Sequence, residues 1–132
     1  MDTHALLEQI YDAINAGRVD DLDELFTADY VDHGDNQDLA AFKQQILAFR
    51  AAFPDLHVTV HDTVIDGDRF ASRTEFTGTH QGELMGLPPT GTRVSVDAVD
   101  MGRIVDGRAA ERWGGLNMFS LLVQLGVIPA PG

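Results

Sequence analysis

The spacing of apolar residues changes once along the chain, at Pro54, and this change constrains the fold more than any other feature. Before Pro54 the apolar side chains recur every three or four residues, as they do on one face of an α-helix. After Pro54 they alternate with polar side chains, which is typical of β-strands that bury one face. The sequence therefore predicts an α+β fold, in which helices cover one side of a sheet.

The first half contains three helical stretches. We expect the first helix to begin at Thr3, as its N-cap, and to end at Gly17, because glycine adopts the left-handed conformation that closes many helices. A short second helix follows, with Asp20 as its cap. The third and clearest helix begins at Asp38 and ends before Pro54, since a proline disfavours the helical conformation in the residue that precedes it.

Two Asp-Gly pairs divide the second half into hairpins. These are Asp66-Gly67 and Asp106-Gly107, and such pairs supply the tight turns that join antiparallel strands. The expected strands are residues 56–65, 69–79, 93–105 and 108–116, with an extended segment at 30–33, an irregular loop at 81–91 and a C-terminal helix at 118–125 that Asn117 caps.

The register of the first hairpin decides which of its residues share a face. A three-residue turn would pair Val64 with Phe70 and Val58 with Phe76, which keeps one face mostly apolar. A two-residue turn would mix apolar and polar residues on both faces, so we predict the longer turn. In this arrangement His80 lies at the inner end of the second strand.

The second hairpin places the acidic residues of greatest interest. A two-residue turn would pair Asp100 with Trp113 and set Glu111 on the same face as both. The small residues of these strands, such as Gly102, permit strong curvature. We therefore expect a single domain over residues 1–132, a curved antiparallel sheet that the N-terminal helices cover and that encloses a pocket.

Composition excludes several functions. The chain has 132 residues and no cysteine, so its chemistry would come from carboxylates, imidazoles and amides. Its 21 acidic and 9 basic side chains give a net charge of −12, which disfavours nucleic acids and anionic membranes as partners. The sequence has neither a signal peptide pattern nor an apolar run of about 20 residues. We expect a soluble cytoplasmic protein, and the uncovered sheet face predicts a homodimer.

Three stretches of sequence carry a resemblance to a known family. They are the segment Phe53-Pro54-Asp55-Leu56-His57, the loop His80-Gln81-Gly82-Glu83-Leu84-Met85-Gly86-Leu87-Pro88-Pro89-Thr90-Gly91, and the ending from Glu111-Arg112-Trp113 to Gln124-Leu125-Gly126. Together they resemble the SnoaL-like polyketide cyclase family. The resemblance implies a nuclear transport factor two-like cone. It also implies ring closure by intramolecular aldol condensation without metal or cofactor, in which a carboxylate acts as general acid and base.

The candidate catalytic residues are Asp100, Glu111 and His80. A buried carboxylate at Asp100 should have a raised pKa, which suits proton transfer α to a carbonyl. The alternative is a structural ion pair with Arg73, Arg103 or Arg112. The remaining candidates are the substrate-binding residues His33, Trp113, Asn117, Phe76 and Met85.

Several roles stay open at this point. Glu111 could be solvated, and His80 and His33 could each bond to a loop instead of meeting at the pocket. Trp113 could be a core residue. His57 and His61 share a strand face, but two histidines without a third ligand are weak evidence for a metal site, so we expect none.

The sequence leaves three hypotheses for function. The first is an enzyme that binds a hydrophobic carbonyl compound and catalyses cyclisation or isomerisation. The second is a binding or dimeric interaction module without catalysis. It gains support from Asn117, because the family commonly has Asp at this position and an amide does not exchange protons at neutral pH. The third is a hydrolase of a small epoxide or ester.

Overall fold

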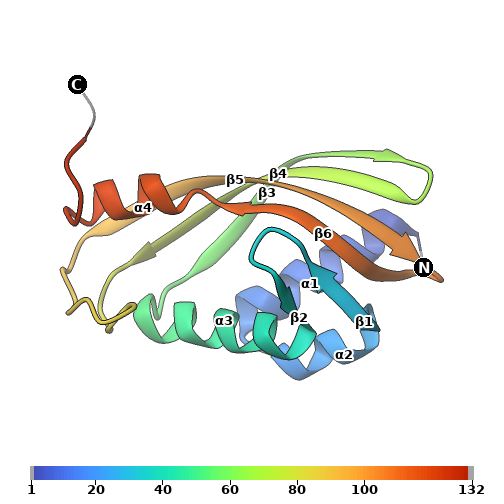
Figure 1. The fold of residues 1–132 in the computed structure, drawn as a ribbon, viewed down its shortest axis with the longest axis horizontal. Helices are drawn as coiled ribbons and strands as arrows, with labels where there is room; N and C mark the ends of the chain where they lie inside the picture. The colour runs from blue at the N-terminus through green and yellow to red at the C-terminus, as the bar shows by residue number, and fades with distance from the viewer. Residues whose placement is uncertain (1, 131–132) are drawn as a thin grey trace.

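The computed structural model describes residues 2–130 of the chain, with helices mainly in the first half and strands mainly in the second (Figure 1). In chain order the elements are α1 (Thr3–Ala16), a 3-10 turn η1 (Val19–Asp21), α2 (Leu22–Leu25), β1 (Phe26–Asp32), β2 (Gln37–Asp38), α3 (Leu39–Ala52), β3 (His57–Asp66), β4 (Arg69–Thr79), β5 (Arg93–Val105), β6 (Arg108–Leu116) and α4 (Met118–Gln124).

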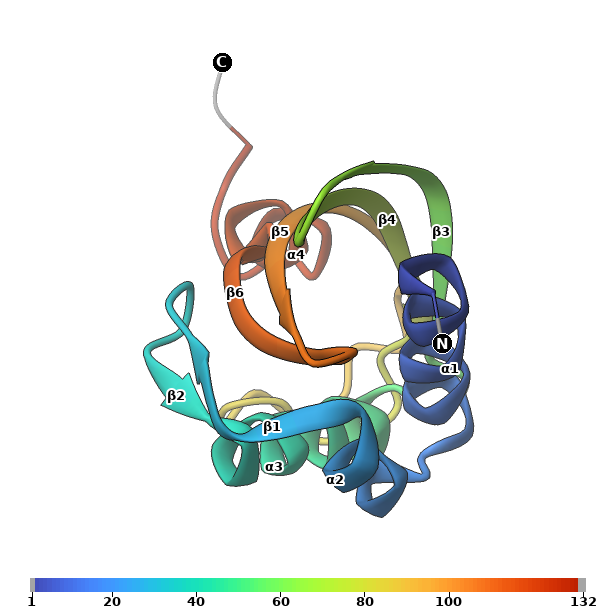
Figure 2. The ribbon, with the colours of Figure 1, turned by 90° about the vertical axis from the view of Figure 1, so that its right-hand side faces the viewer.

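One curved sheet holds all six strands, in the order β2-β1-β6-β5-β4-β3. Strands β3 to β6 curl round a central space, with α1 beside β3 and α3 below (Figure 2). The predicted α+β cone is confirmed. The prediction of a purely antiparallel sheet is wrong in one place, because β1 pairs with β6 in parallel. This pairing uses the segment that the sequence indicated only as a short extended piece.

The helix boundaries follow the expected capping chemistry with two corrections. The N-cap of α1 is Asp2 instead of Thr3, because the Asp2 carboxylate accepts a hydrogen bond from the backbone N–H of Ala5. Gly17 ends the helix with a φ of 74°, as predicted. Asp20 does not cap a helix but lies inside η1.

The third helix agrees with its prediction in detail. The Asp38 side chain accepts a hydrogen bond from the backbone N–H of Ala41, which satisfies one of the free donors of the first turn of α3. The helix ends at Ala52, just before Phe53 and Pro54. Phe42 and Ile46 of this helix are buried in the interior.

The first hairpin has a shorter turn than predicted. Asp66 pairs with Arg69, and Ile65, instead of Val64, pairs with Phe70. The pairing of Val58 with Phe76 is nevertheless correct, because a bulge between Val60 and Asp62 inserts one residue and restores the expected register. As a result Val64 points outward and is 68% exposed.

The second hairpin has the predicted turn but a different register. A bulge between Arg103 and Ile104 places two residues of β6 against one of β5, so Asp100 pairs with Gly114 and Met101 pairs with Trp113. The shift by one residue moves every later side chain of β6 to the opposite face. Arg112, instead of Glu111 and Trp113, therefore shares the inner face with Asp100.

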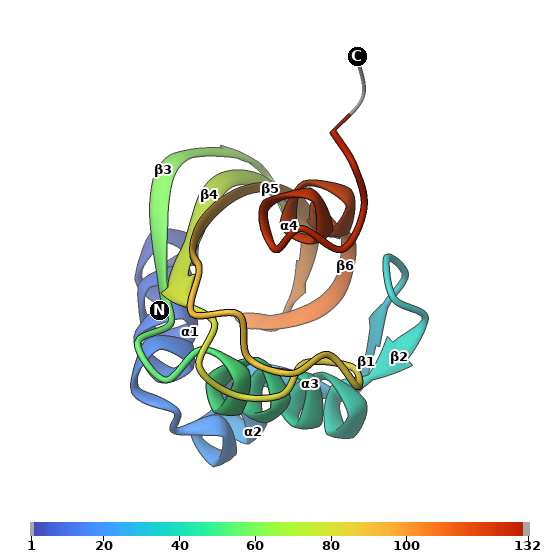
Figure 3. The same cartoon turned by 90° about the vertical axis from the view of Figure 1, so that its left-hand side faces the viewer.

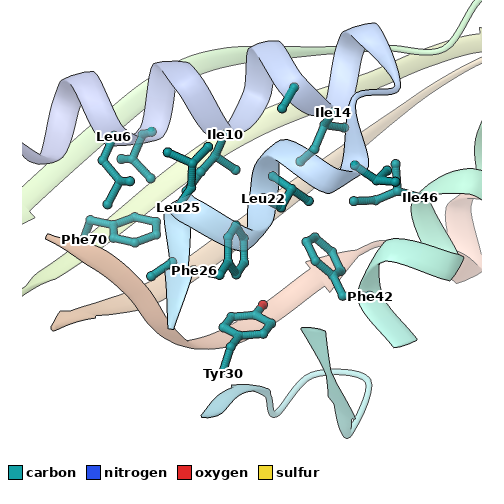
Figure 4. Close-up of a cluster of buried hydrophobic side chains, with 14 residues drawn as sticks. Leu6, Ile10, Ile14, Leu22, Leu25, Phe26, Tyr30, Phe42, Ile46 and Phe70 are labelled. Carbon is teal, nitrogen blue, oxygen red and sulfur yellow. The ribbon is translucent and has the colours of Figure 1, made fainter. Parts of the chain in front are cut away.

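Two groups of buried apolar residues fill the interior. The larger group lies between α1, β1 and α3, where Leu6, Ile10 and Ile14 of α1 face the aromatic rings of Phe26 and Phe42 (Figure 4). The smaller group gathers around Phe53 and Phe76 at the other end of the sheet and includes Leu121 of α4. Burial of these side chains supplies the main driving force for folding.

Helix α4 covers the end of the sheet that faces the viewer in Figure 3. Asn117 caps it by accepting a hydrogen bond from the backbone N–H of Ser120, as expected. Gln124 accepts a hydrogen bond from the Ser95 N–H at 2.9 Å and donates one to the Ser95 carbonyl at 2.8 Å. Within residues 2–130, no helix has both the length and the apolar character that crossing a membrane requires.

Candidate functional site

A cavity of about 170 Å³ lies between the concave face of the sheet and helices α1 and α3. Most of its walls are apolar, from residues such as Phe49, Phe70 and Phe76. This composition suits a hydrophobic ligand with a few polar groups to orient it. The polar residues that line the cavity are Tyr11, Tyr30, Asp35, Gln45, Thr74, Asp100, Glu111 and Arg112.

Asp100 is the acidic residue held deepest among the apolar walls. It lies on β5 and alternates with the inward-facing residues Val96 and Ala98, and it is only 6% exposed. Burial raises the pKa of its carboxyl group, while the Arg112 guanidinium and the Tyr11 hydroxyl act in the opposite direction. The sequence-based expectation of a buried carboxyl with a raised pKa is therefore confirmed.

Arg112 connects two buried carboxylates. Its Nη2 and Nε atoms lie 2.9 Å and 3.2 Å from Oδ1 of Asp100, and its Nη1 lies 2.8 Å from Oδ2 of Asp32. The guanidinium also lies over the ring of Phe42 at 5.5 Å. Asp100 thus forms the ion pair that the sequence offered as an alternative to function, and it lines the cavity as well.

Asp32 holds Arg112 in place from the opposite side. It ends β1 and is fully buried. Its Oδ1 accepts hydrogen bonds from the backbone N–H groups of Gly34 and Asp35, and its Oδ2 accepts one from Gln37 in addition to that from Arg112. Four donors fix this carboxylate, so it supports the geometry of the site as a structural anchor.

Two tyrosine hydroxyl groups complete the polar part of the cavity. The Tyr11 hydroxyl lies 3.4 Å from Oδ2 of Asp100. The Tyr30 hydroxyl is buried and has no hydrogen-bond partner among the described residues. Burial raises the pKa of both groups above the ordinary tyrosine value, so both stay protonated and are available as donors.

Glu111, His33 and Trp113 form a separate group centred on the outer side of the sheet. Oε1 of Glu111 accepts a hydrogen bond from Nε of Arg103 at 3.0 Å, and Oε2 lies 3.1 Å from Nε2 of His33. The Arg103 hydrogen bond is the main reason why the pKa of Glu111 is lowered. The ring of His33 stacks on Trp113 with centroids 4.9 Å apart. Glu111 contributes to the cavity wall, but both of its carboxylate oxygens are engaged by this outer group.

The remaining predicted residues are scattered. Phe76 lines the cavity. His80 is fully buried beside Phe53. Its Nδ1 accepts a hydrogen bond from the backbone N–H of Thr90 at 3.2 Å and lies 3.0 Å from the Thr90 hydroxyl. Met85 is 67% exposed in the following loop, and Asn117 caps α4. None of these last three is among the residues that line the cavity, and His80 and His33 do not meet.

Sequence reasoning missed most of the polar partners of Asp100. Arg112 entered only as one of three candidate ion-pair partners, and Tyr11 was not a candidate. Tyr30 and Asp32 lie in the expected extended segment 30–33, of which only His33 was a candidate. One signal was available, because Asp32 lies two residues before the turn sequence Gly34-Asp35, and an Asp side chain at such a position commonly accepts backbone hydrogen bonds from the turn.

The described residues contain no group of three or more acidic or histidine side chains arranged to hold a metal ion. Nε2 of His61 lies 2.9 Å from a carboxylate oxygen of Glu75, so one of the two histidines considered for a metal has a hydrogen-bond partner.

Comparison with known proteins identifies the family to which this chain belongs. The model of the SnoaL-like polyketide cyclase family matches residues 4–125, and the chain belongs to this family. It is 33% identical over 121 residues to the nogalonic acid methyl ester cyclase of Streptomyces nogalater, an alignment that covers 86% of this chain and 90% of the cyclase. It is 29% identical over 110 residues to the aklanonic acid methyl ester cyclase DnrD of Streptomyces peucetius, covering 78% of this chain and 76% of DnrD.

Solved structures of similar proteins share this fold. AclR of Streptomyces galilaeus, provisionally described as a hydroxylase, superposes with a TM-score of 0.87 and 35% identity, covering 98% of this chain and 83% of AclR. IdmH of Streptomyces antibioticus, provisionally described as a polyketide cyclase, superposes with a TM-score of 0.84 and 32% identity, covering 96% of this chain and all of IdmH.

Proposed function

We propose that this protein binds a neutral, hydrophobic carbonyl compound of the polyketide type and that Asp100 catalyses its cyclisation by proton transfer, without a cofactor. One observation carries the proposal: the Asp100 carboxylate lies in an apolar cavity with one oxygen fixed by Arg112. A carboxyl group whose pKa is raised by burial is a stronger base than an exposed one.

The reaction transfers one proton from a carbon atom to an oxygen atom of the substrate. Oδ2 of Asp100 removes the proton α to a carbonyl group, and the electron pair of the C–H bond forms an enolate. The enolate carbon attacks a second carbonyl carbon of the same molecule and forms the ring C–C bond. The alkoxide that results takes the proton back from Asp100. The sum of these steps is an isomerisation that leaves Asp100 unchanged.

The developing negative charge on the enolate oxygen needs a donor. Tyr30 suits this role, because its hydroxyl is buried, lines the cavity and has no partner among the described residues. A donor that is already in place stabilises the transition state without reorganisation of solvent. We assign this role to Tyr30 and not to His80 or Asn117, neither of which lines the cavity.

The charges of the site favour a neutral ligand. Asp100 and Asp32 contribute two carboxylates and Arg112 one guanidinium, which both carboxylates already engage. A ligand with a free carboxylate would therefore meet excess negative charge in a medium of low dielectric constant. The names of two relatives, which specify methyl esters, are consistent with a neutral substrate.

The test uses nogalonic acid methyl ester as the probe. In heavy water, unreacted probe should gain deuterium at the α-carbon through reversible formation of the enolate, and the ring-closed product should have the mass of the probe apart from any such deuterium. The Asp100→Asn variant should bind the probe but lose both exchange and cyclisation by at least about a hundredfold. A matched control is Asp97→Asn, at an exposed position of the same strand. Full activity of Asp100→Asn would exclude Asp100 as the base.

A second candidate function is binding without catalysis. It is favoured by the engagement of Asn117 as a helix cap and by the ion pair between Arg112 and Asp100, both of which have a structural purpose. Binding of the probe without α-hydrogen exchange in the wild-type protein would support this function. Product mass separates the remaining possibilities: hydrolysis adds one water molecule, whereas hydroxylation, the activity provisionally ascribed to AclR, adds one oxygen atom.

A further inference from the structure

Gln45 is a polar residue on an otherwise apolar part of the cavity wall. Four residues of α3, a helix that the structure describes in full, line the cavity, and the other three are Phe42, Ile46 and Phe49. A ligand that fills the cavity removes water from the side chain of Gln45. A polar group that loses water without gaining a new partner weakens the complex, so this residue affects which ligands bind.

Two hydrogen bonds hold the amide of Gln45 against the turn between β1 and β2, which lie beside α3 (Figures 2 and 3). Its Nε2 donates to Oδ2 of Asp35 at 3.2 Å, and its Oε1 accepts from Nε2 of Gln37 at 2.9 Å. A carboxylate only accepts hydrogen bonds, so the bond to Asp35 identifies which amide atom is the nitrogen. The amide is therefore oriented before a ligand binds.

The amide of Gln45 keeps hydrogen-bonding capacity that the protein does not use. A glutamine side chain has two N–H donors and a carbonyl oxygen with two lone pairs. Asp35 takes one N–H, Gln37 takes one lone pair, and no other residue between 2 and 130 bonds to this side chain. One donor and one acceptor position remain, and a hydroxyl group, which both accepts and donates, matches them.

Gln45 belongs to the same hydrogen-bonded network as Asp100 but lies at its other end. Nε2 of Gln37 also donates to Oδ2 of Asp32 at 3.2 Å. The same oxygen of Asp32 accepts from Arg112, which holds Asp100. Three side chains thus separate Gln45 from Asp100 in the network, and we expect the two residues to meet different parts of one ligand.

We propose that Gln45 is a specificity-determining residue, which recognises a hydroxyl group on the part of the ligand remote from Asp100. The inference rests on the proposed function and narrows its substrate class to neutral carbonyl compounds with such a hydroxyl group. The hydroxyl replaces the water that the ligand displaces, whereas a hydrocarbon at this position leaves the free N–H of Gln45 without an acceptor. The Asp35 carboxylate beside the amide disfavours an anionic group at the same position.

The test measures the binding of two matched probes by isothermal titration calorimetry. The probes are acetylnaphthalene and its derivative with a hydroxyl group on the ring that does not carry the acetyl group. Wild-type protein should bind the hydroxyl derivative at least about tenfold more tightly. Gln45→Met keeps the length of the side chain without the amide, so it should bind both probes with similar affinity. The matched control is Gln44→Met, at the neighbouring exposed position of α3, which should keep the wild-type preference.

The ratio of the two dissociation constants separates recognition of the ligand from a structural role. If Gln45 only attached the turn to α3, Gln45→Met would weaken both probes equally. Gln45→Asn, which withdraws the amide by one methylene group, is a second variant with the same expected loss of preference, and circular dichroism confirms which variants are folded.

Four results would each overturn the inference: a wild-type protein without the preference, a wild-type protein that binds neither probe, a preference that persists in the folded Gln45 variants, and loss of the preference in Gln44→Met. Failure of the proposed catalysis is distinguishable from these results. A preserved preference together with no α-hydrogen exchange in nogalonic acid methyl ester would count against catalysis alone.

Discussion

The guanidinium of Arg112 holds a single oxygen of Asp100, with Nη2 2.9 Å and Nε 3.2 Å from Oδ1. The other oxygen, Oδ2, has the Tyr11 hydroxyl 3.4 Å away. This unequal pairing fixes the orientation of the carboxylate while leaving one oxygen less tightly engaged. A base that must accept a proton from a ligand benefits from such an arrangement, because its geometry is set before the ligand arrives.

Replacing Arg112 with Met should alter both stability and the pH profile. Asp32 and Asp100 would lose their shared cation, so unfolding should become easier by about 3–5 kcal/mol, measured by urea denaturation. Arg112 lowers the pKa of Asp100, so its removal should raise that pKa further and shift the acid limb of the rate profile to higher pH.

A matched control for this variant is Arg73→Met, which breaks the exposed ion pair with Asp62. The cost there should be no more than about 1 kcal/mol, because solvent screens exposed pairs. An Arg112→Met enzyme whose rate profile coincides with that of the wild type would contradict electrostatic control of Asp100 by Arg112.

Replacing Tyr30 with Phe tests whether the Tyr30 hydroxyl contributes to stability or to catalysis. The Tyr30 hydroxyl is buried without a partner among the described residues, so its removal should leave stability unchanged or increase it. The rate of cyclisation of the methyl ester probe should fall roughly a hundredfold if this hydroxyl polarises the carbonyl group. The control Thr74→Val removes a different hydroxyl from the cavity wall. Equal losses in both variants would argue against a specific role for Tyr30.

Replacing His80 with Ala should affect folding instead of chemistry. The His80 ring packs on Phe53 and accepts a hydrogen bond from the Thr90 backbone, so its loss should reduce the free energy of unfolding by roughly 2–4 kcal/mol. At a temperature where the variant is folded, its turnover number should match that of the wild type. Met85→Ala, in the same loop but exposed, should change stability by less than about 0.5 kcal/mol. A folded His80→Ala variant without turnover would restore the catalytic role that the sequence suggested.

The elements of the fold were predictable because each depends on local sequence. The helix from Asp38 ends where Pro54 requires it to end. The second hairpin turns at Asp106-Gly107, and the first turns one residue after its expected start, at Gly67-Asp68. Resemblance to the family added the cone shape. Asp100 was predictable as a buried acid because its apolar neighbours on β5 mark the inner face.

The partners of Asp100 were not predictable, for two physical reasons. A bulge of one residue exchanges the faces of a strand, so the insertion in β6 put Arg112 inside and moved Trp113 outside. No local pattern in the sequence marks that insertion. Tyr11 and Asp32 reach the site through tertiary contacts with residues 89 and 80 positions away. The bulge in β3 had a milder effect, because it corrected the register instead of reversing it.

The pH dependence of the free energy of unfolding should show how much the ionised Asp100 carboxylate destabilises the folded protein. Burial raises its pKa above the ordinary value of 3.8, so the folded protein holds this proton more tightly than the unfolded chain does. The stability that this proton adds to the folded state is fully present below the ordinary pKa. It is lost as the pH rises through the raised pKa of the folded protein. Asp100→Asn does not ionise, so its stability relative to wild type should improve as the pH rises across this window, measured by thermal unfolding. A relative stability of Asp100→Asn that falls with pH would show that the attraction of Arg112 outweighs burial.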